Sequence, residues 1–143
     1  MSIEFLDHTA DAAVRIRARD AAELFQDATL ALLSLYLGES GTVACFVRES
    51  IAVSLEAENG EALLIDYLNE LIFLFDTRRF LTRRIDFSTL FLGPPCRLEG
   101  LARGETLDLA RHEPQTEIKA ATFHGLEIRQ TNGGVEADVV FDL

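Results

Sequence analysis

The spacing of apolar residues predicts two long helices in the first half of the chain. Between Asp20 and Gly38, apolar residues recur at intervals of three and four, which is the period of one apolar stripe on a helix. Asp20 with Glu23 three residues later is typical of a helix start, and Gly38 of a helix end. A second helix is predicted over residues 61–75. Its stripe is so wide that we expect burial on more than one side and a narrow polar face around Asn69.

Alternation of apolar with polar residues predicts about seven strands, most of them in the second half of the chain. Their ranges are 14–18, 51–55, 85–91, 98–102, 107–109, 118–128 and 135–143. The turn residues Arg103-Gly104-Glu105 predict a hairpin between the fourth and fifth of these strands. The polar face of the first strand is lined with arginine, beginning with Arg15, and that of the last strand carries acidic residues such as Asp138.

This order, with helices early and strands bunched late, predicts an α+β fold. We expect residues 1–143 to form a single two-layer domain, in which two main helices pack on a largely antiparallel sheet of about seven strands. A chain of 143 residues can bury roughly two thirds of the surface that it exposes when unfolded. The helices would cover one face of the sheet, which leaves the arginines and the acidic residues to share the other face.

The charge of the chain limits the ligands that it can bind. With 24 acidic and 13 basic residues, the formal net charge is −11, which repels a phosphate backbone. Direct binding to nucleic acid is therefore not expected, whereas cations and basic protein surfaces fit.

Cysteine usage and the lack of targeting patterns indicate a compartment. Cys45 and Cys96 lack metal-ligand spacing and are expected to be free thiols in a reducing environment. No segment has the pattern of a signal peptide or the apolar length that a membrane span needs. The chain is therefore predicted to be a soluble cytoplasmic protein that does not act at a membrane.

Carboxylates gather near both ends of the sequence. Asp7 and Asp11 lie four residues apart with His8 between them, and the sequence closes on Asp142-Leu143, where a side-chain carboxylate neighbours the terminal one. If the first and last strands are neighbours, these oxygens converge. Negative charges so near to each other are stable only with a cation between them. Oxygen ligands of this kind predict a site for a divalent metal ion, Ca²⁺ or Mg²⁺.

Other interpretations of the same residues stay open. The run from Asp7 to Asp11 is also typical of a loop that caps its own backbone, an interpretation that the sequence alone slightly favours. A metal-dependent hydrolase built on Asp7, Asp11 and His8 is conceivable, because such a cluster can activate water. A residue such as His8 more often orients a neighbouring carboxylate. The chain shows no nucleotide-binding or serine-nucleophile motif.

Lys119 lies in an apolar stretch that is predicted to be a strand. On the polar side of the sheet its ammonium group would need an acidic partner, which Asp11 or Asp142 could supply. Alternatively, the side chain lies on a solvated face and covers apolar surface with its stem. The sequence alone gives the two interpretations equal weight.

Several motifs, taken in order along the chain, resemble the archease family. They are Leu6-Asp7-His8-Thr9-Ala10-Asp11, Leu24-Phe25, Leu63-Leu64, Leu68-Asn69-Glu70-Leu71, Gly104-Glu105, His112, Glu117-Ile118-Lys119-Ala120 with Thr122, and Phe141-Asp142-Leu143. The combination is specific, whereas each motif alone is not. One departure is Phe123, where the family usually has tyrosine, so any hydrogen bond that the family makes with that hydroxyl is missing here.

The resemblance implies a function without catalysis. Archeases are accessory proteins of the RtcB-type RNA ligase of tRNA splicing and RNA repair, and they promote its guanylylation and its multiple turnover. They are also linked to chaperoning a tRNA methyltransferase. The alternatives for this chain are therefore a stand-alone metal-dependent hydrolase and a methyltransferase chaperone.

The resemblance also assigns roles to residues of this chain. The family's metal ligands correspond to Asp11, Asp142 and Leu143, and Lys119 corresponds to a lysine that is tied to function. Asp7 is expected to support the metal ligands without binding the metal. His8 is expected to support them too, because a histidine in this position can orient a neighbouring carboxylate. Ca²⁺ is the first expectation for the metal, with Mg²⁺ or Mn²⁺ as alternatives.

Overall fold

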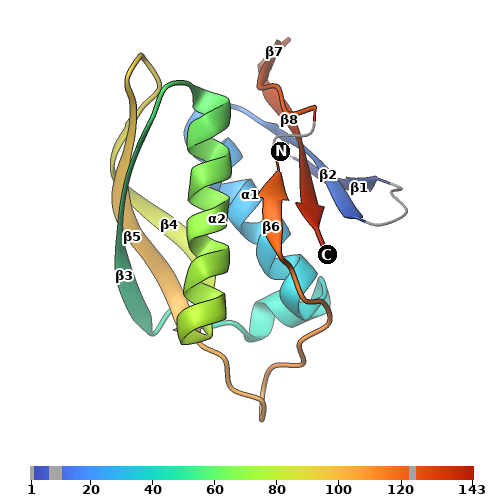
Figure 1. Cartoon of the computed structure of the whole chain (residues 1–143). Helices are drawn as coiled ribbons and strands as arrows, with labels where there is room; N and C mark the ends of the chain where they lie inside the picture. The colour runs from blue at the N-terminus through green and yellow to red at the C-terminus, as the bar shows by residue number, and fades with distance from the viewer. Residues whose placement is uncertain (1, 7–10, 123–124) are drawn as a thin grey trace.

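The computed structural model of the chain describes residues 2–6, 11–122 and 125–143. These residues form two long helices, a short 3-10 helix and eight strands, whose arrangement is shown in Figure 1. Their bounds are β1 Ser2–Leu6, β2 Asp11–Ala18, α1 Ala21–Leu37, η1 Ser40–Ala44, β3 Glu49–Ala57, α2 Gly60–Arg78, β4 Phe80–Phe91, β5 Cys96–Thr106, β6 Ala120–Thr122, β7 Arg129–Thr131 and β8 Gly134–Asp142.

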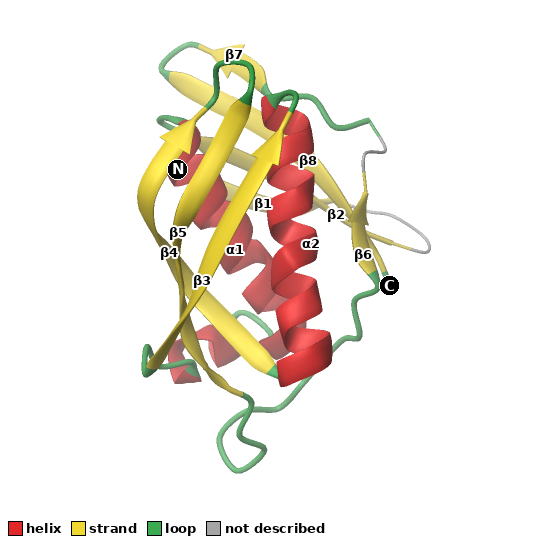
Figure 2. Ribbon diagram, turned by 60° about the vertical axis from the view of Figure 1, so that its left-hand side comes forward, coloured by secondary structure: helices red, strands yellow, loops and turns green. Residues whose placement is uncertain are grey.

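The strands form two antiparallel sheets with the helices between them (Figures 1 and 2). One sheet has the order β1-β2-β8-β6, with β7 also paired to β8, and the other has the order β3-β5-β4. Helix α1 packs on β2 and β4, and α2 packs on β3, β4 and β6, so each helix contacts both sheets. The predicted α+β fold, with two helices against antiparallel strands, is confirmed. The difference is that the eight strands are divided between two sheets, whereas about seven in one sheet were expected.

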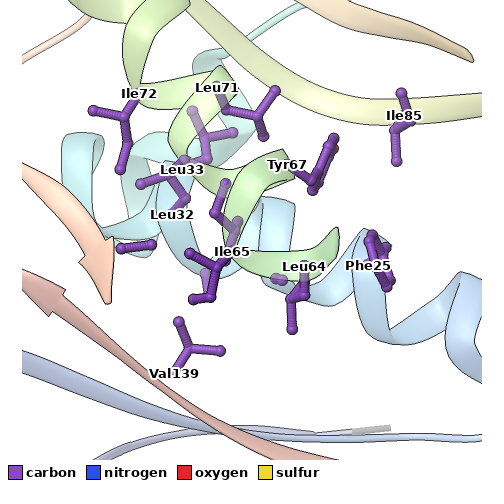
Figure 3. Close-up of a cluster of buried hydrophobic side chains, with 14 of the residues drawn as sticks. Phe25, Leu32, Leu33, Leu64, Ile65, Tyr67, Leu71, Ile72, Ile85 and Val139 are labelled. Atoms are coloured by element: carbon purple, nitrogen blue, oxygen red, sulfur yellow. The ribbon is translucent and has the colours of Figure 1, made fainter. Parts of the chain in front are cut away.

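The width of the apolar surface on each helix explains this arrangement. In α2, Leu63, Leu64 and Ile65 are buried in succession, which places apolar side chains around more than half of the helix. Figure 3 shows Leu64 and Ile65 among buried side chains from α1 and both sheets, including Phe25 and Val139. Full burial of one such side chain contributes about 1.5–3 kcal/mol. The predicted burial of the second helix on more than one side is therefore confirmed.

Local hydrogen bonds set the ends of the helices, and those of α1 were predicted. Asp20 precedes α1, and its side-chain oxygen accepts a hydrogen bond from the backbone N–H of Glu23 at 2.9 Å. Gly38 ends the helix with a φ of 77°, a conformation that glycine adopts without steric cost. At α2, the side chain of Asn59 caps the first turn through the N–H of Ala62 at 2.8 Å.

The predicted hairpin at Arg103-Gly104-Glu105 is wrong. These residues lie inside β5, which runs without a turn from Cys96 to Thr106. A Cβ atom at Gly104 would lie 1.8 Å from the backbone oxygen of Leu81 in β4. Glycine is therefore needed for the close approach of two strands, and not for a change of direction. Because the chain does not turn back at Gly104, the predicted strand 107–109 is absent. Lys119, which was expected inside a strand, lies just before β6.

Candidate functional site

The first residue of β2 and the last residue of β8 face each other across the sheet. Asp11 and Asp142 are Cα partners in the antiparallel pairing of these strands. Residues in such a pair point to the same face, with Cβ atoms about 4.5–5.5 Å apart. Val14 of β2 and Phe141 of β8 are fully buried toward the helices. By strand alternation, the two carboxylates therefore lie on the outer face of this sheet.

Farther along the same face, arginines neutralise the acidic residues of β8. Arg15 binds Asp138 through two hydrogen bonds of 2.8 and 3.0 Å, and Arg17 binds Glu136 at 2.7 Å. Arg129 of β7 contacts both carboxylates. The hydrogen bond from Arg15 holds the pKa of Asp138 below its ordinary value, and that from Arg129 does the same for Glu136. The expected sharing of this face by arginines and acidic residues is confirmed.

The end of the face near Asp142 differs from the rest. Among the residues that the structure describes, no lysine or arginine forms an ion pair with the Asp142 carboxylate. Its backbone oxygen accepts a hydrogen bond from the N–H of Lys119 at 2.8 Å, and β6 continues that pairing with Ala120 opposite Asp142. The Lys119 side chain is exposed and forms no ion pair within the described ranges. An ion pair of Lys119 with Asp11 or Asp142, which the sequence left open, is therefore not formed among these residues.

Asn69 of α2 holds this edge of the sheet in place. Its amide oxygen accepts a hydrogen bond from the N–H of Ala121 at 2.8 Å, and its amide N–H donates to the Ala121 oxygen at 3.1 Å. The side chain therefore pairs with the outer edge of β6 as another strand would. Sequence reasoning placed Asn69 on a polar helix face and missed this contact. The available signal was an uncharged amide among the acidic residues of that polar face, such as Asp66 and Glu70.

The donor set at Asp11 and Asp142 matches a hard cation in chemical type. Two carboxylates share one face, and the backbone oxygen of Leu143 follows directly on Asp142; Ca²⁺, Mg²⁺ and Mn²⁺ prefer such oxygen ligands. No group of three or more His, Cys, Asp or Glu side chains suited to a metal occurs among the described residues. Asp7 and His8 were predicted to support the site, and Phe123 to depart from the family pattern; all three lie outside the described residues.

A hollow opens beside this end of the sheet. It has a volume of about 750 Å³ and lies between the end of α2 and the segment that leads into β6. Lys119 and Arg79 line it, together with Tyr36 and Phe75, whose rings stack at a centroid distance of 4.2 Å. Neither Asp11 nor Asp142 lines the hollow; it is connected to their sheet through Lys119, whose backbone N–H is bonded to the backbone oxygen of Asp142.

The buried thiols and His112 do not resemble a catalytic centre. Cys45 and Cys96 are free and buried, as predicted for thiols without a disulfide. Burial raises the pKa of Cys45 to about 11, with a further contribution from the charge of Glu105, so the thiol is protonated at neutral pH. His112 is also buried, and its ring binds Glu105 and the backbone of Ala44 and Asp108. Each of these groups has a packing role.

No helix within the described ranges is long and apolar enough to cross a membrane.

Known proteins with similar sequences share the full length of this chain. Residues 3–143 match the Archease protein family (MTH1598/TM1083). "Protein archease" of Methanothermobacter thermautotrophicus is 34% identical over 140 residues, which cover 98% of this chain and 97% of the relative. "Protein archease" of Archaeoglobus fulgidus is 32% identical over 145 residues, with all of both chains covered.

Two solved structures resemble this one. The solution structure of protein 1598 from Methanobacterium thermoautotrophicum matches with a TM-score of 0.82 and 33% identity, covering 99% of this chain and 98% of that one. The crystal structure of an archease from Thermotoga maritima matches with a TM-score of 0.60 and 24% identity, covering 96% of this chain and 94% of that one. The second resemblance concerns the fold alone.

Proposed function

The chain belongs to the archease family, and from this premise we propose that it is a non-enzymatic accessory protein of an RtcB-type RNA ligase. In this role it promotes guanylylation of the ligase and its multiple turnover in tRNA splicing or RNA repair. The proposal rests on family membership together with one structural observation, the pairing of Asp11 with Asp142 on the outer face of the sheet.

That pairing supports the proposal because the Asp142 carboxylate differs from the carboxylates farther along the same strand face. The carboxylates of Glu136 and Asp138 are bound by arginines, and such ion pairs need nothing from another molecule. No lysine or arginine forms an ion pair with the Asp142 carboxylate among the described residues. Two carboxylates held in register repel each other unless a cation lies between them. The arrangement therefore suits a bound divalent ion or a basic surface of a partner.

Asp11, Asp142 and the oxygens of Leu143 are the groups that would hold the ion, with Ca²⁺ as the first expectation and Mg²⁺ or Mn²⁺ as alternatives. A bound divalent ion supplies a positive centre that attracts phosphate oxygens. The residues of this chain fix where that centre lies. Asn69 holds β6 through Ala121, β6 pairs with β8, and Asp142 is thereby kept in register with Asp11.

The net charge of −11 provides the attraction between the two proteins. A ligase that binds RNA needs a positively charged cleft, and an acidic protein surface is complementary to such a cleft. Complementary charges accelerate encounter more than they strengthen the final complex. Lys119 lies beside Asp142 with its ammonium group exposed, and we assign it a contact with the ligase or with a nucleotide phosphate in the cleft.

A ligation assay with a purified RtcB-type ligase, under limiting metal and GTP, tests the proposal. The wild-type protein should support repeated turnover, whereas Asp142→Ala and Asp11→Ala should keep their fold by circular dichroism and lose the stimulation. Glu58→Ala is the matched control, because it removes the same charge at an exposed position after β3. Full stimulation by both aspartate variants would remove the role of the carboxylate pair.

A stand-alone metal-dependent hydrolase built on Asp11, Asp142 and His8 is the competing function. Incubation of the purified protein with Ca²⁺, Mg²⁺ or Mn²⁺ and generic phosphoester or amide substrates, without any ligase, distinguishes the two. Turnover that is lost in Asp142→Ala would favour the hydrolase. Absence of turnover, combined with stimulation of the ligase, would favour the accessory protein.

A chaperone of a tRNA methyltransferase is the second competitor, and the archease of Thermotoga maritima is itself called a possible chaperone. Exposed apolar side chains such as Val43 and Phe73 make this function worth testing. A chaperone would prevent aggregation of the methyltransferase equally well with Asp11→Ala and Asp142→Ala. Loss of that protection in the same variants would instead tie it to the carboxylate pair.

A further inference from the structure

Three residues of the archease-like motifs take no part in the proposed metal site. They are Gly104, Glu105 and His112. Gly104 and Glu105 belong to β5, in the sheet opposite the one that carries Asp11 and Asp142 (Figure 1). His112 follows in the segment after β5. Their contacts converge on the last residue of η1 and on residues 45–48, the link between η1 and β3.

Glu105 is a buried carboxylate that anchors this link. It is 2% exposed and accepts hydrogen bonds from the backbone N–H of Phe46 at 2.6 Å and from Arg111 at 2.6 Å. Its distance to the His112 ring is 3.2 Å. Burial alone would raise the pKa of Glu105, but the hydrogen bonds from Arg111 and Phe46 outweigh it and lower the pKa to about 2. The carboxylate is therefore ionised at neutral pH and holds the link firmly.

This anchor keeps an aromatic ring at the surface. Although the Phe46 N–H is bound to buried Glu105, the residue is 44% exposed. The guanidinium groups of Arg48 and Arg111 lie 5.2 and 4.9 Å from the centre of its ring, within the range of cation–π attraction. The position of the ring is thus set before any partner arrives, which reduces the entropy lost on binding.

A bulge in β4 brings an arginine to the same place. Thr82 pairs with Gly104 and Arg84 pairs with Arg103, so Arg83 is the extra residue of a β-bulge, a feature that redirects side chains. Gly104 permits this bulge, because a Cβ atom there would strike Leu81 and approach the Arg83 nitrogen at 3.1 Å. Arg83 forms no ion pair with any described residue.

Arg83 and the link share one hollow. Its volume is about 490 Å³, and its lining includes Val43, Phe46, Val47 and Arg83. Val43 is 75% exposed and Val47 is 40% exposed. We call this surface, made by Val43, Phe46, Val47, Arg48, Arg83 and Arg111, the Phe46 face. It combines aromatic, aliphatic and arginine side chains, the types that are enriched where proteins bind each other most tightly.

The chemistry of the Phe46 face indicates what covers it. The charged side chains of this face are arginines. Arg48 and Arg111 share the charge of Glu105, and Arg111 also contacts Asp108, whereas Arg83 has no ion pair among the described residues. The face therefore keeps a positive charge in a chain whose net charge is −11. RNA would meet repulsion from the rest of the molecule, and a second copy would bring another −11. An acidic segment of a different protein, short enough to meet only this face, is complementary in charge.

We propose that the Phe46 face binds a segment of a partner protein in which Asp or Glu residues flank an apolar or aromatic side chain. The apolar group fills the hollow between Val43, Phe46 and Val47, and the carboxylates bind Arg83 and Arg48. The site is separate from the proposed ligase contact and does not depend on it.

Binding of short fluorescein-labelled peptides, followed by anisotropy, tests this inference. One peptide alternates Asp and Glu with Leu and Phe, the second has Lys in place of the acids, and the third has Ser in place of Leu and Phe. The first should bind the full chain, and the other two should bind about tenfold more weakly. Amide NMR signals of residues 43–48 and 83–84 should shift on addition of the first peptide.

Matched variants locate the site. Phe46→Ser and Arg83→Glu should each weaken binding of the acidic apolar peptide about tenfold. Phe73→Ser removes a phenylalanine that is 57% exposed on α2, and Arg78→Glu reverses an exposed charge at the end of α2; both should bind as the wild type does. Thermal unfolding shows whether each variant is folded. If Phe46→Ser is unfolded, the comparison of Arg83→Glu with Arg78→Glu tests whether the peptide binds at the Phe46 face.

Four results would overturn the inference. The first is equal binding of the lysine peptide, and the second is no binding of any peptide. The third is binding of a single-stranded RNA oligonucleotide that Arg83→Glu abolishes, which would make the face a nucleic-acid site. The fourth is a dimer in sedimentation experiments that Phe46→Ser dissociates, which would assign the face to a second copy.

Discussion

Asn69 and Ala121 are joined by two hydrogen bonds, one in each direction, between a helix side chain and a strand backbone. Substitution of Asn69 by Leu leaves the N–H and C=O of Ala121 without these partners. A buried backbone group without a partner costs about 1–3 kcal/mol, and two such groups are left here, so we expect the free energy of unfolding to fall by at least that amount. Urea unfolding measures the loss, and hydrogen exchange should accelerate at Ala121. Asn59→Leu, which removes the N-cap of α2, should leave exchange at Ala121 unchanged.

Ca²⁺ should stabilise the folded protein through Asp11 and Asp142. A ligand at about one hundred times its dissociation constant adds about 2.7 kcal/mol to the free energy of unfolding. The thermal midpoint of the wild type should therefore rise on addition of Ca²⁺ and fall again with a chelator. Asp142→Asn should show neither change, while Glu58→Gln should behave as the wild type does. An identical rise in all three proteins would show that the ion binds elsewhere.

Salt should weaken the complex with an RtcB-type ligase mainly by slowing association. The Debye length falls from about 10 Å at 0.1 M to about 3 Å at 1 M ionic strength, so attraction between a cleft and a chain of net charge −11 is screened. Stopped-flow or surface-binding measurements should show the association rate falling with salt while the dissociation rate changes little. An association rate independent of salt would contradict electrostatic steering.

Glu105 should make stability depend on pH in the acidic range. Its pKa is about 2 in the folded protein and 4.5 ordinarily; a lowered pKa stabilises the fold above pH 4.5, and this contribution disappears as the pH falls toward 2. Glu105→Gln should lower the free energy of unfolding by about 3 kcal/mol at neutral pH. Urea unfolding should show the variant and the wild type converging on acidification. A constant difference would mean that the charge is not responsible.

Asp27 should have the opposite effect. It is 1% exposed in α1, and its carboxylate oxygens have no hydrogen-bond partner among the described residues. Burial, with a contribution from Glu23, raises its pKa from 3.8 to about 6. Its contribution to stability is complete below pH 3.8 and is lost as the pH rises through 6. Asp27→Ala should therefore be more stable than the wild type by about 2 kcal/mol at about pH 8, with the advantage disappearing near pH 4. A gain that persists there would reflect helix propensity alone.

Elements that depend on nearby residues were predictable. Asp20, Glu23 and Gly38 define α1 through contacts within a few residues, and the structure has these caps where they were expected. Apolar periodicity also predicted both helices and the burial of α2 on more than one side. It did not show that two sheets, and not one, provide that burial. A stripe of apolar residues specifies how much surface must be covered, but not which strands cover it.

Gly104 shows why one prediction failed. A glycine between two apolar stretches is typical of a turn, and it is equally suited to a position where two backbones meet closely. The deciding atom is the oxygen of Leu81, which belongs to a neighbouring strand and has no local trace in the sequence. For the same reason, nothing near Glu105 in the sequence indicated that its carboxylate would be buried against Phe46 and Arg111.

The sequence by itself determined the local parts of this protein: the helices with their caps, most strands, the excess of negative charge, and the placing of Asp11 and Asp142 near opposite ends. Only the tertiary structure decided that β2 and β8 are neighbours and that their register sets these two residues face to face. The physical reason is range. Capping and periodicity act over a few residues, whereas strand order and register follow from the burial of side chains distributed over the whole chain.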